Sequence, residues 1–364
     1  MPLPHAAAMI DQQAAACGEL GSPLYEFLLR RAALDVAAGG PCAAAIAGYE
    51  QAPGPDAIAL RLLGGVHALV LTGRAPALAA YYPSAGGEFT LPVPEAAWTA
   101  FLATVAEHLD WVRTWLTRPP QTNETGRANL LIAGLLHLLA DAPHPVRLFE
   151  LGASAGLNLL ADRFRCEWSG GAHGPADSPV RLTDAWRREP VFRSDRPLPA
   201  LEFTERRGCD LTPIDPLSPE GALALRAYVW ADRPERAARL DGALALAAKH
   251  SAPVERLGAA EFLRRVSVAE GTLTVVWHSV MRQYVPADEW ALVETELTRL
   301  ADAATPTAPF AHIAFEPNRV AGSDQRRFVL TVRTGTAPEQ VLAEAVPHGL
   351  PAWAWSERPG LPVG

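Results

Sequence analysis

The sequence contains few of the residues on which several kinds of chemistry depend. Lys249 is the only lysine among 364 residues, and it follows two alanines rather than a glycine-rich turn. A phosphate-binding P-loop requires a lysine after glycine, and Schiff-base enzymes such as those that use pyridoxal phosphate require a reactive lysine. The sequence therefore argues against both classes.

Cysteines are also few. The four cysteines, Cys17, Cys42, Cys166 and Cys209, are scattered, without a Cys-x-x-Cys pair or a close pairing of cysteine and histidine. Zinc sites and disulfide frameworks both need such spacings. We expect no metal site and four reduced, mostly buried thiols.

Long apolar runs and an excess of positive charge are missing as well. The longest apolar run, Leu130–Ala140, contains His137 and is shorter than the roughly 20 residues that span a bilayer. No lysine or arginine precedes the first alanines and Asp11 follows them, unlike a secretory signal. The formal net charge of -8 disfavours binding to phosphate backbones. We expect a cytoplasmic protein that binds neither membranes nor nucleic acids; the sequence does not indicate its oligomeric state.

The composition that remains is that of a folded protein of about two domains, with 49% apolar and 20% charged residues. Residues 1–144 are expected to form an all-helical domain. Apolar residues recur at helical spacing over Trp98–Leu116, and a second helix is expected over Gly126–Ala140. The proline-rich stretch Pro143–Pro145 follows and marks the expected domain boundary.

Residues 145–364 change to short β-branched or aromatic runs that alternate with helical segments. This alternation predicts an α/β domain with a doubly wound, mostly parallel sheet. Strands are expected at Arg147–Leu151, Glu202–Asp210, Val254–Leu257, Leu273–His278, His312–Glu316, Phe328–Val332 and Ala352–Trp355. Helices are expected at Leu157–Phe164, Pro219–Lys249, Ala260–Val266, Ala287–Ala303 and Pro338–Ala345. A stretch rich in glycine, proline and aspartate, near residues 169–199, is expected to be an insertion over the sheet edge.

The first expected strand ends in a turn of small residues, within RLFELGASAG at 147–156. Gly152, Ser154 and Gly156 would let a ligand approach backbone N–H groups at the positive end of the next helix. Glu150, at the end of the strand, would direct a carboxylate at cationic or hydroxyl groups of that ligand. A tight turn with a solvated Glu150 explains the same residues.

The turn also fits the G-x-S-x-G nucleophile elbow of α/β-hydrolases, with Ser154 as the nucleophile. Asp215 or Asp302 and His312 or His348 follow in the permitted order. The context argues against this interpretation, because the elbow normally follows several strands and an oxyanion loop, and the preceding residues are expected to be helical.

A second acidic residue ends the next expected strand, in GCDLTPID at 208–215. Nucleoside-binding folds place at this point the acid that accepts the two ribose hydroxyls. Asp210 therefore becomes a candidate ligand residue. Its alternative role is to cap a turn or a helix.

These segments resemble known families. ELGASAGLNLLADRF with GCDLTPIDP resembles the first two motifs of class I S-adenosylmethionine-dependent methyltransferases. The segments GSPLYEFLL, QTNETGRANLL, ELGASAGLNLL, RAYVWADRPERAARL and VVWHSVMRQYV resemble a bacterial family called domain of unknown function 2332, over nearly the whole chain. The resemblance implies a Rossmann-like, methyltransferase-like fold. It places the turn of Gly152, Ser154 and Gly156 on the methionine part of the cofactor, Glu150 near its amino group and Asp210 on its ribose.

Two departures from the methyltransferase pattern concern the adenine and the substrate. Gly258-Ala259-Ala260 stands where many such enzymes have an acid that meets the adenine amine. Trp277-His278-Ser279 stands in place of the Asn/Asp-Pro-Pro-Tyr motif of amino-directed DNA and protein methyltransferases. A small molecule is therefore the expected substrate.

Three residues are candidates for catalysis. His278 ends the fourth expected strand, where it would act as a general base, although a buried, hydrogen-bonded histidine is the alternative. Glu124 and Arg127 begin the helix before the first strand. We expect the helices of residues 1–144 to cover the carboxyl ends of the strands, with Glu124 and Arg127 facing the pocket together with His278. A surface pair of Glu124 and Arg127 is the alternative.

The sequence thus predicts an S-adenosylmethionine-dependent methyltransferase that acts on a small molecule. Two other interpretations stay open: a non-catalytic nucleoside-ligand-binding or interaction protein of the same fold, and a serine hydrolase that uses the GASAG turn. Fold alone does not separate them, because one architecture hosts many functions.

Overall fold

The computed structural model describes residues 4–90, 95–140, 142–192, 197–319 and 326–355. The chain forms two compact units: unit 1 comprises Met1–Thr122 and Ser218–Ala238, and unit 2 comprises Asn123–Leu217 and Arg239–Gly364. The expected domain division at residues 144 and 145 stays a prediction, whereas compact unit 2 already begins at Asn123.

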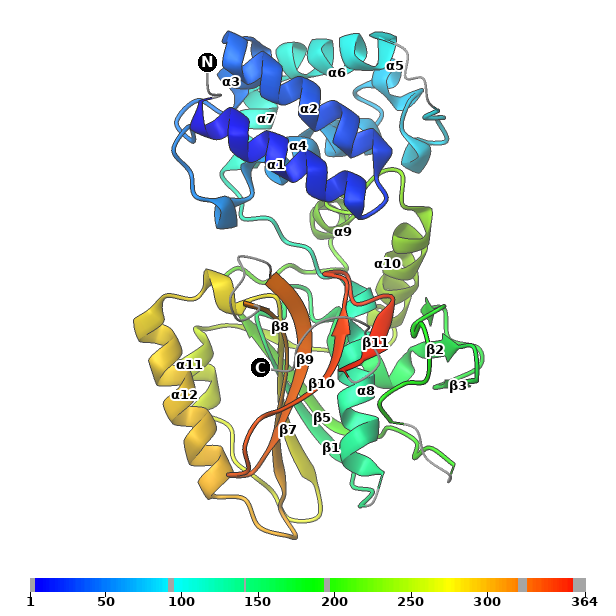
Figure 1. Ribbon diagram of the computed structural model, residues 1–364, viewed down its shortest axis with the longest axis vertical. Coiled ribbons are helices and arrows are strands. Elements are labelled where there is room, and N and C mark those ends of the chain that lie inside the picture. Colours follow the sequence, from blue (N-terminus) through cyan, green and yellow to red (C-terminus); the bar gives the residue numbers. More distant parts are fainter. Residues whose placement is uncertain (1–3, 91–94, 141, 193–196, 320–325, 356–364) are drawn as a thin grey trace. The chain divides into compact units, whose positions relative to one another are not determined.

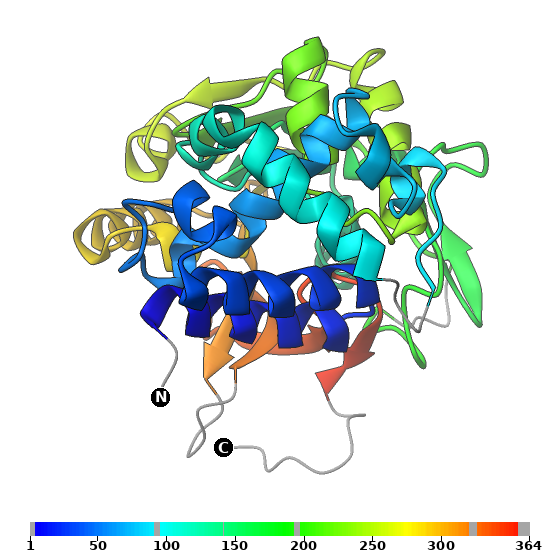
Figure 2. The same ribbon diagram turned by 90° about the horizontal axis from the view of Figure 1, so that it is seen from above.

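Unit 1 consists of helices in the part that the structure describes. They are α1 (His5–Glu19), α2 (Pro23–Ala38), α3 (Pro41–Ala45), α4 (Ile58–Leu71), α5 (Pro76–Ala79), α6 (Glu95–Glu107), α7 (Leu109–Leu116), α9 (Pro219–Ala227) and the first part of α10 (Pro234–Ala247). Helices α1 and α2 lie side by side (Figures 1 and 2). Ser22 caps α2, and Gly39 ends it in the left-handed conformation. None of the described helices has the length and apolarity needed to cross a membrane.

The downstream segment of unit 1 is joined to its N-terminal helices by polar contacts. The Asp232 carboxylate accepts a hydrogen bond from Ser22 Oγ at 2.6 Å and one from the N–H of Leu24 at 3.0 Å. The guanidinium of Arg233 donates to the carbonyl of Leu20. Trp230 is buried in the same apolar core as these helices. The start of α2 therefore depends on residues about two hundred positions later in the chain.

Two helices predicted as continuous are each divided in two. The expected helix over Trp98–Leu116 is broken between α6 and α7 at His108, whose φ of -117° and ψ of 32° are not helical. The expected helix over Pro219–Lys249 is broken between α9 and α10, just before Pro234. Proline lacks a backbone donor and disfavours the helical conformation in the residue before it, which explains the second break.

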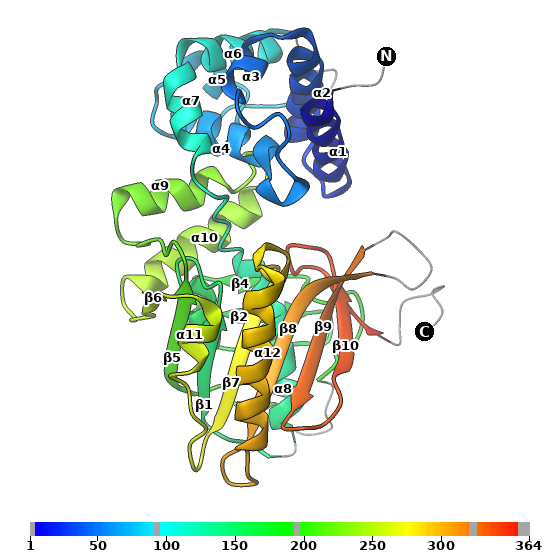
Figure 3. The same ribbon diagram turned by 90° about the vertical axis from the view of Figure 1, so that its left-hand side faces the viewer.

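Unit 2 contains a large, mostly parallel sheet, which makes the chain a mixed α/β protein, as the sequence predicted. Its strands are β1 (Val146–Leu151), β5 (Phe203–Asp210), β6 (Val254–Arg256), β7 (Leu273–Ser279), β8 (Phe310–Arg319), β9 (Arg326–Thr334), β10 (Gln340–Ala345) and β11 (Ala352–Ala354). Their order is β11-β10-β9-β8-β7-β1-β5-β6 (Figure 3). The strands β6, β5, β1, β7 and β8 are parallel to one another. The last three strands each run antiparallel to the strand before them.

The predicted helix over Pro338–Ala345 is wrong. The segment forms β10, which pairs antiparallel with β9 and with β11. Alanine, leucine and glutamate favour a helix locally. Pairing on both sides, and the burial of Leu342, Ala343, Glu344 and Ala345, override that preference.

Helices cover both faces of the sheet (Figures 1 and 3). The short α11 (Ala259–Leu263) and α12 (Ala287–Asp302) pack on one face, in an apolar core with Phe149, Leu151 and Val276. Helix α8 (Ala128–Leu139) packs on the other face, where Gly134 allows a close approach to Ile313 of β8. The expected insertion near 169–199 contains most of a small second sheet of β2 (Arg165–Trp168), β3 (Gly171–His173) and β4 (Arg181–Leu182), and its residues 193–196 lie outside the described part.

Candidate functional site

The order of the parallel strands creates a switch point at β1. The chain places β5 and then β6 on one side of β1, and β7 and then β8 on the other side. The loops that leave the carboxyl ends of β1 and β7 therefore run in opposite directions. Open α/β sheets bind ligands in the crevice outside the strands at such a point, so the candidate site lies there.

The turn after β1 has an unusual backbone. Gly152, Ser154 and Gly156 have φ angles of 67°, 54° and 72°. The following segment is a 3-10 helix, η4 (Leu157–Arg163), instead of the expected α-helix. The N–H of Leu157 donates to Asn123 Oδ1 at 2.9 Å. The expected anion site at a helix N-terminus is therefore not formed by this short helix, whose first N–H group already has a partner.

Asp210 connects the turn after β1 to the end of β5. Its Oδ2 accepts the N–H of Ser154 at 2.9 Å, and its Oδ1 accepts the N–H of Thr212 at 2.8 Å. The structure thus brings together two of the predicted ligand residues, Ser154 and Asp210. Each carboxylate oxygen can accept a further hydrogen bond, so the turn role and a ligand role are compatible.

Glu150 is a buried acid at the end of β1. Its side chain is 2% exposed, and Oε2 has no hydrogen-bond partner. Burial raises the pKa of Glu150 to about 8. Side-chain hydrogen bonds from Trp277 and Asn158 and the positive charge of Arg127 oppose this shift, and the negative charge of Asp210 adds to it. Desolvation disfavours the charged form of an acid. An unpartnered carboxyl oxygen in a buried place costs free energy that a hydrogen-bond donor would recover.

The segment before α8 lies beside this acid. Glu124 is buried and forms an ion pair with Arg239, with 3.8 Å between Oε1 and Nη2. Its backbone carbonyl accepts a hydrogen bond from Asn158 Nδ2 at 3.5 Å, and the side chain of Asn158 is also a hydrogen-bond partner of Glu150. The Nε of Arg127 donates to the carbonyl of Pro347 at 3.1 Å. The structure thus gathers Glu124 and Arg127 around Glu150, and neither side chain is part of a simple surface pair.

His278 lies on the other face of the sheet from Glu150. Glu150 is opposite Trp277 in the register of β1 and β7, and neighbouring residues of a strand point to opposite faces. His278 contacts Trp290 of α12, with ring centroids 5.2 Å apart. The structure therefore separates His278 from the predicted cofactor residues and places it, hydrogen-bonded to Glu316, on the α12 face.

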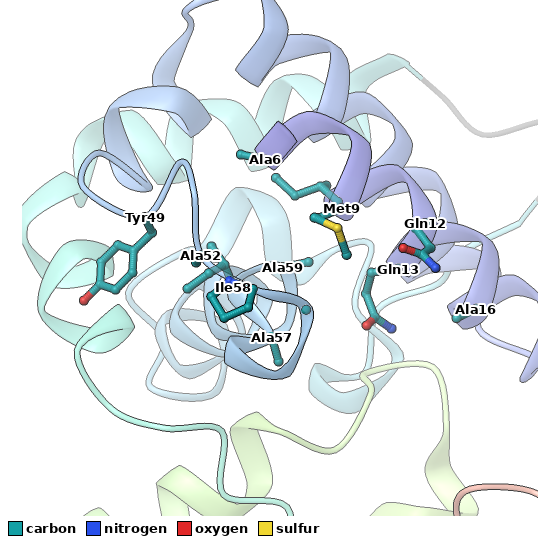
Figure 4. Close-up of a pocket in the computed structure, with 13 residues that line it drawn as sticks. Ala6, Met9, Gln12, Gln13, Ala16, Tyr49, Ala52, Ala57, Ile58 and Ala59 are labelled. Carbon is teal, nitrogen blue, oxygen red and sulfur yellow. The ribbon is translucent and has the colours of Figure 1, made fainter. Parts of the chain in front are cut away.

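Unit 1 has a pocket of its own, of about 250 Å³ (Figure 4). Its lining is largely apolar, with Met9 and Ile58, and it includes Gln12, Gln13 and Tyr49. No carboxylate, histidine or basic side chain is found among the described residues that line it. Across the described residues, no group of three or more histidine, cysteine, aspartate or glutamate side chains is arranged to hold a metal ion.

A family model described as "uncharacterized protein conserved in bacteria (DUF2332)" matches residues 7–354. The chain belongs to the DUF2332 family. The match extends over both compact units, in agreement with the resemblance noted in the sequence. No curated protein and no solved structure matches this DUF2332 chain.

The GASAG turn of this DUF2332 protein lacks the contacts of a catalytic triad. Ser154 is 6% exposed, and its Oγ has no hydrogen-bond partner among the described residues. His312 is one of the histidines expected to serve it, and it lies beside His278 on the α12 face, with ring centroids 5.1 Å apart. An activated serine requires a base within hydrogen-bond reach, so the geometry gives the hydrolase interpretation no support.

One residue of the DUF2332 site was not predicted. Asn158 is 2% exposed, and its Oδ1 has no hydrogen-bond partner. The available signal was a single amide inside the apolar run Leu157–Ala161, since a polar residue in such a run needs a partner when it is buried. Asn158 thereby adds a second unsatisfied polar atom on the Glu150 side of the sheet.

Proposed function

We propose that this protein binds S-adenosylmethionine at the carboxyl ends of β1 and β5 and transfers its methyl group to a small molecule. The observation that carries the proposal is the buried Oε2 of Glu150, which has no partner at the switch point of the sheet. The proposal includes the finer classification of unit 2 as a methyltransferase-like Rossmann fold, preceded by a helical domain. The parallel strand order supports it, because the strands stand in the order third, second, first, fourth, fifth.

The cofactor's polar groups match the unsatisfied groups of the site. Its ammonium would donate to Glu150 Oε2, which needs a donor, and a cation there favours the ionised form of this acid. Its ribose hydroxyls would donate to Asp210, whose oxygens each accept only one backbone N–H. No acid follows β6 at Gly258–Ala260, so we expect adenine to be held without a carboxylate.

The chain's own residues would act mainly by binding and orientation. When bound, S-adenosylmethionine supplies an electrophilic methyl group on a sulfonium. Methyl transfer is accelerated by holding the acceptor in line with that methyl group. Glu150 would fix the methionine end, and Asp210 the ribose, on the turn that they flank. Glu124 and Arg127 would contact the acceptor; the hydrogen bond of the Glu124 carbonyl to Asn158 and the effect of the Arg127 charge on Glu150 support this role.

Calorimetric and thermal titrations with S-adenosylhomocysteine test the proposal, because a ligand of the native state raises its stability by mass action. At a hundredfold excess over Kd the free energy of unfolding should rise by about 2.7 kcal/mol. Glu150→Gln and Asp210→Asn should each weaken binding at least tenfold. Asp302→Asn, at an exposed position on α12, should bind like the unsubstituted protein. Absence of any shift at millimolar ligand would overturn the proposal.

Methyl transfer itself is tested with methyl-labelled S-adenosylmethionine and a panel of small amines, alcohols and acids. Labelled product that is absent with Glu150→Gln supports an enzyme. Tight binding without transfer to any member of the panel would favour the alternative, a nucleoside-ligand-binding protein without catalytic activity.

A further inference from the structure

A second pocket lies on the α12 face of the sheet, away from the site proposed above. It has a volume of about 600 Å³ and is lined by residues of β7, β8, β9 and α12 and of the segment 337–339 (strands and α12 in Figure 3). Its polar lining includes His278, His312, Glu316, Arg282 and Arg333. All of these elements belong to unit 2.

A carboxylate–histidine pair forms the wall of this pocket. Glu316 Oε1 lies 2.8 Å from His278 Nδ1 and also accepts the N–H groups of Met281 at 2.9 Å and Arg282 at 3.2 Å. An oxygen that already accepts two backbone donors acts as an acceptor toward the ring as well. The hydrogen-bond network therefore assigns a proton to Nδ1 of His278, and in the neutral ring Nε2 is then an acceptor.

Several buried atoms around the pocket have no hydrogen-bond partner among the residues that the structure describes. They are His278 Nε2, His312 Nε2, Glu316 Oε2 and Arg333 Nε. The first three belong to residues that are 2%, 7% and 9% exposed. Buried polar atoms are normally satisfied, and each one left unpaired costs free energy. Four such atoms around one pocket indicate a place for a polar ligand.

The types of these atoms define what the ligand must offer. His278 Nε2 and Glu316 Oε2 are acceptors and require a donor, whereas Arg333 Nε is a donor and requires an acceptor. Burial lowers the pKa of His312 well below its usual value, so this ring is neutral. Glu294, Glu316 and Glu339 outnumber Arg282 and Arg333 in the lining, which favours a positively charged donor.

We propose that this pocket binds a small zwitterion of the amino-acid type. Its ammonium group donates to Glu316 Oε2 and His278 Nε2, and its carboxylate accepts from Arg333. The guanidinium of Arg282 lies 4.6 Å above the Trp290 ring and donates to the carbonyl of Val285 at 3.3 Å, so it closes the end of the pocket at α12. The inference is independent of S-adenosylmethionine, because it uses the opposite face of the sheet from Glu150.

The test uses the full-length protein and the proteinogenic L-amino acids at millimolar concentration, with thermal unfolding as the readout. We expect at least one of them to stabilise the protein. The matched controls are the amine that lacks the carboxylate of this amino acid and the acid that lacks its amino group. Each control should bind at least tenfold more weakly than the amino acid. Stabilisation by no amino acid, or binding of either control as tight as that of the amino acid, would overturn the proposal.

Substitutions test whether the stabilising amino acid binds in this pocket. Glu316→Gln and Arg333→Met should each weaken binding of that amino acid at least tenfold, and Asp302→Asn should leave it unchanged. Arg333→Met keeps the test decisive if Glu316→Gln does not fold, because Glu316 holds the N–H groups of the loop after β7, whereas Arg333 lies on β9 opposite His312. Glu150→Gln should not alter amino-acid binding, which separates this inference from the proposed function. Undiminished binding in Arg333→Met would contradict it.

Discussion

At the scale of single residues, Glu150 has the most unusual environment of the candidate site. It is buried at the end of a parallel strand, with one oxygen that has no partner and a pKa raised to about 8. Burial of an acid without a partner costs free energy, and a cationic ligand can recover this cost. The cost is measurable without the ligand, through the pH dependence of the free energy of unfolding.

We expect Glu150→Gln to change how stability depends on pH. The native pKa of about 8 lies above the reference value of 4.5, so the native state keeps a proton that the unfolded chain releases. The contribution of Glu150 to stability is therefore present at low pH and decreases as pH rises toward 8, by about 1.4 kcal/mol per unit. The glutamine variant lacks this contribution.

Chemical unfolding of both proteins between about pH 5 and pH 8 measures the difference. The free energy of unfolding of the unsubstituted protein, minus that of Glu150→Gln, should fall by up to about 4 kcal/mol over this interval. A constant difference would show that Glu150 is not a protonated, buried acid.

The second prediction at this scale concerns Ser154, whose φ is 54° and whose Oγ has no partner. If it serves only as a turn residue, Ser154→Ala should leave S-adenosylhomocysteine binding within about twofold and change stability by less than about 1 kcal/mol. A serine-directed fluorophosphonate should not label the chain. Stoichiometric labelling at Ser154 would establish the hydrolase alternative, because only an activated hydroxyl reacts in this way.

At the scale of elements, the loop after β7 connects the two faces of the sheet. Val280 has a φ of 52°, a rare conformation for a β-branched residue. Next to it, the N–H groups of Met281 and Arg282 are held by Glu316, and an added Cβ at Gly152 would lie 3.0 Å from Cβ of Met281. The loop is therefore fixed from the α12 face while its methionine packs on the turn after β1.

Relief of this backbone strain should raise stability. Val280→Gly is expected to increase the free energy of unfolding by about 1 kcal/mol, since glycine adopts a positive φ without steric cost. Val280→Ala is the matched control: it removes the two γ-methyl groups but keeps Cβ, so it should give no gain. Equal loss of stability in both variants would mean that the backbone at Val280 is not strained.

The sequence predicted β1, β7 and β8 because each contains a short run rich in apolar residues. It failed for β10, where the residues are good helix formers and only pairing with β9 and β11 makes them a strand. It also placed His278 with Glu150, because both end a parallel strand. Which face a side chain takes depends on strand register, and a shift of one residue reverses it. Local composition determines neither the tertiary pairing of a strand nor its register.

At the scale of the whole molecule, the expectation that the helices of residues 1–144 cover the ligand stays a prediction. Hydrogen exchange with and without S-adenosylhomocysteine tests it. A cover that closes on the ligand should slow amide exchange in segment 123–127 and in helices of unit 1, as well as in the turn after β1. Glu150→Gln should show no slowing. Protection confined to the loops after β1 and β5 would show that the helices do not act as a cover.

The division of unit 1 into two chain segments has a consequence for biosynthesis. Residues 1–122 emerge from the ribosome long before Asp232 and Trp230 are synthesised. Asp232 accepts hydrogen bonds from Ser22 and Leu24 at the start of α2. Trp230 is part of the same apolar core. The N-terminal helices of the nascent chain therefore keep apolar surface exposed while the first strands of unit 2 are synthesised. A fragment that ends at Thr122 should expose this surface and aggregate, whereas a chain that extends through Ala238 contains both segments of unit 1.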